Sequence, residues 1–212
     1  MKNDLTEGRM AFEKQLDIMC AGAFSVSNDS DLKWVYFLDG LKDGDNNIAA
    51  LIRCNDMLRQ TFADSEHYQN YSVIMKNELI FRKSGMVVGD KFFYDNYCTY
   101  QNTDFETWRK QSFESNTWQL FPLEEIDTGE RTFQAMTFSY PVRNYIQQEP
   151  EANAVVQFLL SKENLEQMFG QLLSRQGGIL IYDAEDRLLA SLGKINADGD
   201  DPENTDLFLS EA

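Results

Sequence analysis

The sequence predicts an α+β fold, and three features indicate it. Apolar residues near the N-terminus recur at helical spacing, the middle of the chain holds short apolar runs joined by tight turns, and the last part combines one amphipathic helix with a hairpin. The 212 residues, of which 42% are hydrophobic and 13% aromatic, suffice for one core, or for one core with a small satellite.

The N-terminal segment predicts a long helix from Leu5 to about Ala23, which the polar stretch "SNDSDL" ends. Its expected buried stripe consists of Phe12, Leu16, Met19 and Ala23. Trp34–Leu38 is a short apolar run closed by Asp39 and Gly40. A second helix is expected to start near Asn46 or Asn47, since either residue can cap it. Its expected inner face consists of Ile48, Leu51, Ile52, Leu58 and Phe62.

The chain then changes from helical spacing to short strands. The stretch "YSVIMKNELIFRKSGMVVG" predicts strands at Tyr71–Met75, Leu79–Phe81 and Met86–Val88, antiparallel because such short turns cannot return a parallel strand. Two further strands are expected at Thr132–Pro141 and Ala154–Leu160, which makes about five in all. Between these groups, "DKFFYDNYCTYQNTDFETWRKQSF" is dense in aromatic residues and has a helical second half that Asp104 caps, and "FPLEEIDTGE" is a connection.

The last part of the chain predicts a helix and a hairpin. Ser161 caps a helix whose apolar residues are Leu165, Met168, Phe169, Leu172 and Leu173. The stretch "GGILIYDAEDRLLASLG", Gly177 to Gly193, then reads as two apolar runs around an acidic turn, which is a hairpin pattern outside the main sheet. The final "NADGDDPENTDLFLSEA" is acidic and poor in apolar residues, so a loop or a frayed end is expected.

Charge and motifs argue against several classes of protein. The net charge of 19 − 35 = −16 repels phosphate backbones, so a nucleic-acid partner is not expected. No apolar stretch reaches the roughly 18 residues that span a bilayer, although a membrane protein without its anchors would look the same. No phosphate-binding, nucleophile-elbow or histidine-rich metal motif occurs, and no cofactor is expected.

The cysteines and the single histidine carry no recognisable catalytic or metal signature. Cys20, Cys54 and Cys98 read as buried thiols, and a bridge between Cys54 and Cys98 stays open because bonding depends on the fold. His67 lies in the polar stretch "ADSEHYQN" and reads as a solvated loop residue, against a Cys98–His67 nucleophile pair as the alternative.

The aromatic stretch is the part of the chain with most promise for binding. Five rings with polar tips, Tyr94, Tyr97, Tyr100, Trp108 and Trp118, accompany the charged residues Asp95, Asp104, Glu106 and Arg109. A core layer is the plain interpretation, since aromatic residues are usually buried. Their position in a connection between strands favours binding instead, because connections carry much of protein function.

The order of several segments resembles double Cache sensor domains, in particular those of Firmicutes AraC-like transcription regulators. The segments are "YSVIMKNELIFRKSGMVVG", "FYDNY", "FETWRKQ", "TFSYPV", "AVVQFLLSKENLEQMF" and "GGILIYDAEDRLLASLG", which follow the N-terminal helix. The resemblance extends from about Leu5 to Gly193. It implies a PAS-like antiparallel sheet packed on a long N-terminal helix, with a small partial second module.

The resemblance also implies a domain organisation and a cellular role. Residues 1–160 would form the membrane-distal ligand-binding module, and residues 161–212 the connecting helix and part of a membrane-proximal module, beginning with the hairpin. The parent protein would be membrane-anchored, with this part on the extracellular side of the cytoplasmic membrane. An AraC-like output is expected, with a histidine kinase or a chemoreceptor as alternatives, and a homodimer through the N-terminal helix is conceivable.

Two departures from the family pattern bear on the ligand. Amino-acid-binding Cache domains use an Arg-x-Trp pattern as a carboxylate clamp, and the matching residues here are Glu106, Thr107 and Trp108. The clamp is therefore missing, and the chain also ends before the further strands of a complete second module. We expect the site to prefer neutral or cationic ligands, because Glu106 stands in place of the arginine and Asp95 and Asp104 lie near it in sequence.

The predicted function is a non-enzymatic sensor for a small organic ligand. The predicted ligand-binding residues are Tyr94, Asp95, Tyr97, Tyr100, Glu106, Trp108, Arg109, Trp118, Phe138 and Tyr140. One rival is a soluble enzyme that uses a carboxylate pair such as Asp95 and Glu106 for acid–base chemistry. Another is a protein-interaction module of PAS-like shape.

Overall fold

The computed structural model describes residues 2–35, 44–62, 70–143, 152–176, 178–194 and 204–209. Its helices are α1 (Lys2–Ser27), α2 (Ser30–Val35), α3 (Gly44–Phe62), α4 (Asp90–Tyr97), α5 (Phe105–Glu114), α6 (Lys162–Met168) and α7 (Gly170–Gln176). Its strands are β1 (Tyr71–Met75), β2 (Leu79–Arg82), β3 (Gly85–Val88), β4 (Thr99–Tyr100), β5 (Gln119–Asp127), β6 (Thr132–Val142), β7 (Ala154–Ser161), β8 (Gly178–Tyr182), β9 (Leu188–Gly193) and β10 (Asn204–Phe208). His67 lies outside the described residues.

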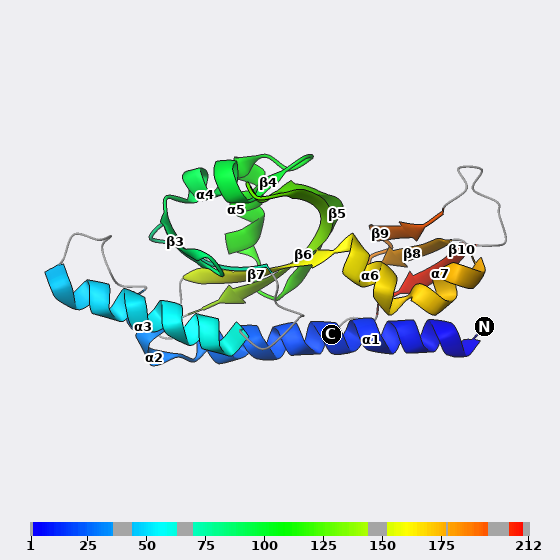
Figure 1. Cartoon of the computed structure of the whole chain (residues 1–212), viewed down its shortest axis with the longest axis horizontal. Coiled ribbons are helices and arrows are strands. Elements are labelled where there is room, and N and C mark those ends of the chain that lie inside the picture. Colours follow the sequence, from blue (N-terminus) through cyan, green and yellow to red (C-terminus); the bar gives the residue numbers. More distant parts are fainter. Residues whose placement is uncertain are drawn as a thin grey trace.

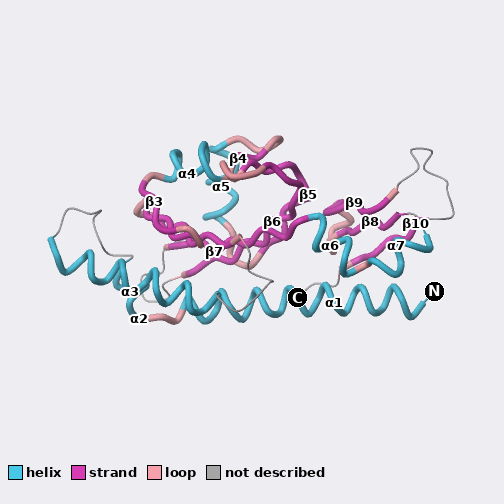
Figure 2. The backbone as a smooth tube through the Cα atoms, viewed as in Figure 1, coloured by secondary structure: helices cyan, strands magenta, loops and turns pink. Residues whose placement is uncertain are grey.

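The strands form two sheets that share one long helix. The larger sheet has the order β3-β2-β1-β7-β6-β5-β4 with antiparallel pairing throughout, and the smaller has the order β10-β8-β9. Helix α1 runs beneath both sheets, α4 and α5 cover the opposite face of the larger sheet, and α6 and α7 lie between α1 and the smaller sheet (Figure 1). The larger sheet is strongly curled (Figure 2). The α+β prediction is confirmed.

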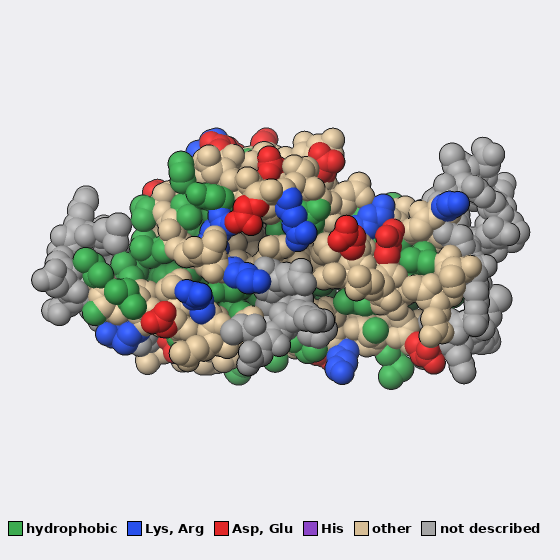
Figure 3. All heavy atoms as spheres, viewed as in Figure 1, with side chains coloured by type: hydrophobic (Ala, Val, Ile, Leu, Met, Phe, Trp, Pro, Cys, Tyr) green, Lys and Arg blue, Asp and Glu red, His purple; other side chains and the backbone are tan. Residues whose placement is uncertain are grey.

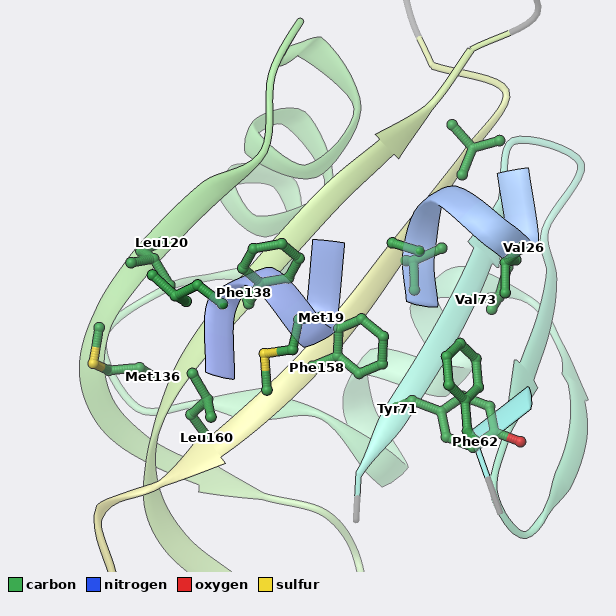
Figure 4. Packing of buried hydrophobic residues seen from close by; sticks show 14 of the residues in the cluster. Met19, Val26, Phe62, Tyr71, Val73, Leu120, Met136, Phe138, Phe158 and Leu160 are labelled. Atoms are coloured by element: carbon green, nitrogen blue, oxygen red, sulfur yellow. The ribbon is translucent and has the colours of Figure 1, made fainter. Parts of the chain in front are cut away.

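The buried stripe of α1 is confirmed and extends further than expected. Phe12, Met19 and Val26 are fully buried, because their spacing of seven residues, about two helical turns, brings them to one helix face. Met19 and Val26 pack on side chains of β6, β7 and β1, among them Phe138 and Phe158 (Figure 4). The helix runs to Ser27, beyond the predicted end near Ala23.

The prediction for the second helix is wrong at its start. Helix α3 begins at Gly44, before the expected cap at Asn46 or Asn47. Ile48 and Ile52 are each 55% exposed, whereas Leu58 and Phe62 are buried. The first turns of α3 project past the edge of the larger sheet, so the sheet does not cover them there (Figure 1). Hydrophobic side chains gather at this end of the molecule in the face that Figure 3 shows.

The larger sheet has seven strands instead of about five, because the sequence analysis missed β4 and β5. The register of β5 on β6 shifts between Phe121 and Glu124, and Pro122 lies in that irregularity. A bulge of this kind interrupts the alternation that marks a strand, which explains the omission. Helix α4 was missed as well, since its aromatic and Asn/Asp residues are weak helix formers, and the burial of Phe93 and Tyr94 stabilises it.

The helix after β7 is capped as predicted but is broken in two. The Ser161 hydroxyl accepts a hydrogen bond from the Asn164 backbone N–H at 3.2 Å. Phe169 separates α6 from α7 with a non-helical backbone, and its ring is buried against α1 and 6.4 Å from the Phe12 ring. Packing of this ring therefore sets the angle between the two short helices.

The hairpin is confirmed, and the tail prediction is corrected. β8 and β9 pair antiparallel in the smaller sheet, outside the larger one. Residues 204–208, predicted as a loop or frayed end, form β10, which pairs with β8 in parallel register. Leu207 is buried in the shared core and the Phe208 ring stacks on Tyr182 at 5.2 Å, so apolar contacts hold this strand despite its acidic surroundings.

The positions of the cysteines decide between buried thiols and a disulfide bridge. None of the three cysteines is in a disulfide, and Cys54 and Cys98 lie in separate apolar clusters, which excludes a bridge between them. Cys54 and Cys98 are buried as predicted, and Cys20 is half-buried. None of the described helices is both long and apolar enough to cross a bilayer.

Candidate ligand site

The larger sheet separates two apolar clusters, and the candidate site belongs to the cluster under α4 and α5. Alternation along β6 assigns side chains to the two faces. Met136 and Phe138 pack on the α1 side, whereas Ala135 and Phe133 pack with the aromatic residues of α4 and α5. The buried Tyr100 hydroxyl hydrogen-bonds the Thr137 hydroxyl at 2.9 Å, which places Thr137 on the α5 side as well.

A cavity of about 210 Å³ lies between α5, the bulge of β5 and the β8–β9 turn. The residues that line it are Tyr100, Thr103, Trp108, Gln111, Phe121, Pro122, Glu124 and Arg187. Tyr100 and Trp108 are buried at its base, whereas Gln111, Pro122 and Arg187 are exposed. The bulge brings both Phe121 and Glu124 to the cavity wall, so the irregularity in β5 shapes the site.

Helix α5 is held firmly over the sheet. The Asp104 carboxylate caps it by accepting a hydrogen bond from the Thr107 backbone N–H at 2.8 Å, which also lowers the pKa of Asp104. At the other end, the Ser112 hydroxyl donates to the Trp108 carbonyl oxygen and accepts from the Gln157 side-chain amide of β7 at 2.9 Å. These buried bonds fix the orientation of the Trp108 side of the helix.

The polar groups near the cavity differ in whether they have hydrogen-bond partners. The Glu124 carboxylate accepts hydrogen bonds from the Asn102 backbone N–H at 2.9 Å and the Thr103 hydroxyl at 3.0 Å. The Tyr94 hydroxyl donates to the Thr103 carbonyl oxygen and so orders the same loop. The buried indole N–H of Trp108 has no hydrogen-bond partner among the described residues. An acceptor that reaches this N–H would gain a hydrogen bond that is otherwise unmade.

Arg187 reaches the cavity from the smaller sheet. Its Nε donates to the Asp183 carboxylate at 2.9 Å, and its Nη2 donates to the Leu120 carbonyl oxygen of β5 at 3.2 Å. Partial burial acts to raise the pKa of Asp183, but backbone N–H donors of Arg187 and Glu185 and the guanidinium charge lower it overall. The turn is thus a compact unit that presents Arg187 to β5.

Seven of the ten predicted site residues lie on the α4–α5 side, and five of these pack around α4 and α5 without ion pairs to other described residues. Tyr100 and Trp108 line the cavity. Tyr94 and Glu106 line an adjoining open groove, where the Tyr94 ring stacks on Tyr100 at 6.3 Å. Tyr97 lies at the far side of α4, with the Arg82 guanidinium 4.1 Å from its ring centroid.

Two further predicted residues on this side are engaged in ion pairs. Asp95 is exposed and pairs with Lys91, one turn earlier on α4. Arg109 pairs with Asp90 and lies over the Phe113 ring at 5.0 Å, so it does not replace the missing arginine clamp. Neither residue is among those that line the cavity.

The structure places the remaining three predicted residues on the opposite face of the larger sheet. Trp118 stacks on Phe138 at 5.6 Å, and both pack with Tyr140 in the cluster that contains α1. The predicted ligand-binding residues therefore do not lie together in one site. The prediction placed aromatic residues of α5 and β6 in one site, although the side chains of successive strand residues point to opposite faces of the sheet.

Six cavity residues were missed by the sequence analysis, namely Thr103, Gln111, Phe121, Pro122, Glu124 and Arg187. Pro122 within an alternating stretch was a usable signal for a bulge, and hence for Phe121 and Glu124 beside it. Arg187 carried no such signal, because only the packing of the second sheet brings it to β5.

The cavity wall supplies aromatic and hydrogen-bonding groups suited to binding a ligand. Asp95 and Glu106, the carboxylate pair of the enzyme alternative, do not share the cavity. Burial raises the pKa of the Cys98 thiol to about 12, so it stays protonated at neutral pH and is a poor nucleophile. Within the described part of the chain, no three His, Cys, Asp or Glu side chains are arranged to hold a metal ion.

Comparison with solved structures shows a fold similar to that of a bacterial sensory domain. The sensory domain of the Campylobacter jejuni chemoreceptor Tlp3, with isoleucine bound, superposes with a TM-score of 0.53 at 14% identity, over 89% of this chain and 68% of that one. This chain thus spans about two thirds of the Tlp3 domain.

Two further matches have lower TM-scores. The extracellular domain of a putative histidine kinase gives 0.49 at 12% identity, covering 88% of this chain and 65% of that chain. The periplasmic domain of LuxQ from Vibrio cholerae gives 0.46 at 10% identity, covering 94% and 80%. At the level of sequence, no protein-family model and no curated protein matches the chain.

Proposed function

We propose that this chain is an extracytoplasmic ligand-binding module of a membrane-anchored signalling protein. The observation that carries the proposal is the cavity of about 210 Å³ under α5, with two buried aromatic side chains at its base and polar groups around them. Pockets of this construction, apolar with a few placed polar groups, are typical ligand sites. The fold, shared with the Tlp3 sensory domain, agrees with a sensor role.

The size and charge of the cavity define the class of ligand. Pockets for drug-sized ligands measure roughly 300–1,000 Å³, so a smaller and more compact molecule fits here. The cavity lining carries one carboxylate, Glu124, and one guanidinium, Arg187, whose formal charges cancel. We therefore favour a neutral or dipolar ligand over a simple dicarboxylate, which Glu124 would repel.

The charge of the cavity is set by residues other than those that the sequence indicated. Glu106 faces the open groove and Asp95 the surface, so neither sets the charge of the cavity. A cationic group on the ligand remains compatible, since Glu124 is an acceptor and the Trp108 ring offers a π face. The isoleucine in the Tlp3 domain is one example of a compact dipolar molecule.

We further propose the type of signalling protein to which this chain belongs. The residues that resemble double Cache domains of AraC-like regulators favour a transcription-regulating output, with a histidine kinase or chemoreceptor as alternatives. In that setting residues 1–160 form the ligand-binding module, residues 161–212 lead toward the membrane, and α1 provides the surface for a homodimer. Met10 and Phe24 are 62% and 60% exposed on α1, which supports a partner on that helix.

The experiment is a thermal-shift screen of amino acids, amines, sugars and carboxylates, followed by calorimetric titration of the best hit. A ligand that binds only the native state raises the melting temperature by mass action. Trp108→Phe replaces the indole that lines the cavity with a smaller ring and should weaken binding. Trp118→Phe is the matched control, because Trp118 lies on the other face of the sheet. Equal affinity for both variants and wild type, or a dicarboxylate as best hit, contradicts the proposal.

A further inference from the structure

We propose that Arg187, which belongs to the smaller sheet, is a ligand-contacting residue of the cavity in the larger sheet, so that ligand binding fastens the β8–β9 hairpin to β5. The inference rests on the proposed function, because it assigns a role within the same cavity. It goes further by naming the group that recognises an acceptor on the ligand and by linking occupancy to the second sheet.

Arg187 has hydrogen-bond donors to spare at the cavity. Arg187 is the one cationic side chain among the described residues that line it. A guanidinium has five N–H donors, and the hydrogen bonds to Asp183 and Leu120 use two of them. The guanidinium can therefore keep both contacts and still donate to a ligand oxygen.

The second argument is the position of the opposite charge. Glu124 follows the β5 bulge, and Leu120, whose carbonyl oxygen accepts from Arg187, precedes it. Donor and acceptor groups thus flank the same irregular stretch of β5. A ligand with a carbonyl or carboxylate at one end and a donor group at the other can satisfy Arg187 and Glu124 together.

The third argument concerns how the hairpin is attached to β5. Strand β9 lies against β5, and the Arg187–Leu120 hydrogen bond joins the turn to the same strand. The turn itself is rigid, since the Asp183 carboxylate accepts hydrogen bonds from the backbone N–H groups of Glu185 and Arg187 at 3.0 and 2.8 Å. A ligand held by Arg187 adds a contact to this junction. Because the two equilibria are linked, contact of the β8–β9 hairpin with β5 raises the affinity for the ligand, and the bound ligand in turn stabilises that contact.

The test uses isobutyramide, a compact neutral probe with a carbonyl acceptor, and isobutylamine, which has a donor and no acceptor. Binding to the whole chain is measured by saturation-transfer NMR for wild type, Arg187→Leu and Arg187→Lys. Arg131→Leu is the matched control, because Arg131 is also an exposed turn arginine but packs over Phe133 at 4.5 Å, away from the cavity lining. Circular dichroism verifies that each variant folds.

We expect Arg187→Leu to weaken isobutyramide binding about three- to tenfold, the range for one exposed charge-assisted hydrogen bond, while Arg187→Lys retains part of the affinity. Isobutylamine binding should stay unchanged or improve, since a nearby positive charge is removed. Hydrogen exchange in β8 and β9 should slow when isobutyramide binds wild type, and should not slow in Arg187→Leu.

The outcomes separate the inference from the proposed function. If isobutyramide binds wild type and Trp108→Phe weakens it, but Arg187→Leu has no effect on affinity or hairpin exchange, the cavity is a ligand site and the role of Arg187 is refuted. If neither probe binds wild type and the ligand screen gives no hit, the ligand site itself is refuted, and the role of Arg187 with it.

Discussion

Gly8 on α1 provides a sharp test of how the long helix holds the smaller sheet. A Cβ atom at this position would lie 2.4 Å from Cδ1 and 2.7 Å from Cε1 of the Phe169 ring. Phe169 is 1% exposed and separates α6 from α7, so its ring has little room to move. The absence of a side chain at Gly8 therefore permits α1 to approach the joint that leads to the second sheet.

Two opposing effects decide the sign for Gly8→Ala. Alanine in a helix interior is more favourable than glycine by about 1 kcal/mol. Ordinary carbon contacts are about 3.5–4.0 Å, so the ring or the helix must shift by roughly 1 Å, and overpacking of this kind costs about 1–3 kcal/mol. Because the Phe169 ring is buried and has little room to move, the cost should lie in the upper part of that range, about 2–3 kcal/mol, which leaves a net destabilisation of about 1–2 kcal/mol. For a chain of this size the melting temperature should fall by about 2–8 °C.

Gly170→Ala is the matched control for this measurement. A Cβ atom at Gly170, the first residue of α7, meets no atom within 4 Å. Thermal denaturation followed by circular dichroism should show Gly170→Ala equal to wild type or more stable by up to about 1 kcal/mol. Adding Phe169→Leu to Gly8→Ala should cost less than the sum of the two single changes, since the clash is relieved. A melting temperature of Gly8→Ala at or above that of wild type would refute the close packing of α1 on Phe169.

Three further predictions follow from burial and from the cited pKa shifts. Phe158→Ala should lower the free energy of unfolding in urea by about 3–5 kcal/mol, because the ring of this β7 residue is fully buried in the core that β7 shares with α1. Phe92 is 54% exposed, so Phe92→Ala should stay within about 0.5 kcal/mol of wild type. Asp183 has a pKa below 3.8 in the folded chain, so its ionised form stabilises the fold at neutral pH, and this stabilisation is lost as the pH falls through the lowered pKa. Hydrogen exchange in the β8–β9 turn should accelerate at that low pH. Asp183→Asn should abolish this pH dependence. The Cys98 thiol, with a pKa of about 12 and full burial, should resist iodoacetamide at pH 8 in native protein and react after denaturation, as mass spectrometry would show; rapid native alkylation contradicts its burial.

Features with a local, repeated pattern were predictable from the sequence alone. The stripe of Phe12 and Met19 on α1 follows from helical spacing, and the antiparallel pairs β1–β2 and β8–β9 follow from apolar runs joined by short turns. The cap at Ser161 likewise needs only its own hydroxyl and the N–H of Asn164. In each case the residues that determine the structure lie within about two turns of helix or one hairpin of each other.

Elements without a regular pattern needed the tertiary structure. β5 hides behind its bulge at Pro122, and β10 is a strand because β8 offers a free edge and the core accepts Leu207. Ile48 and Ile52 have the spacing of a buried face but remain exposed, because α3 extends past the sheet that would cover them. Propensity and spacing state which face is apolar, and only neighbouring elements decide whether it is covered.

The candidate site shows the same division most clearly. The sequence alone determined that an aromatic stretch with polar tips, including Tyr100 and Trp108, lies between the strands of an α+β domain. Only the tertiary structure decided that Trp118 and Phe138 lie on the opposite face, and that Arg187, 67 residues beyond Leu120, completes the cavity wall. The physical reason is that a pocket is formed by the surfaces of elements distant in sequence, so its members share no period along the chain.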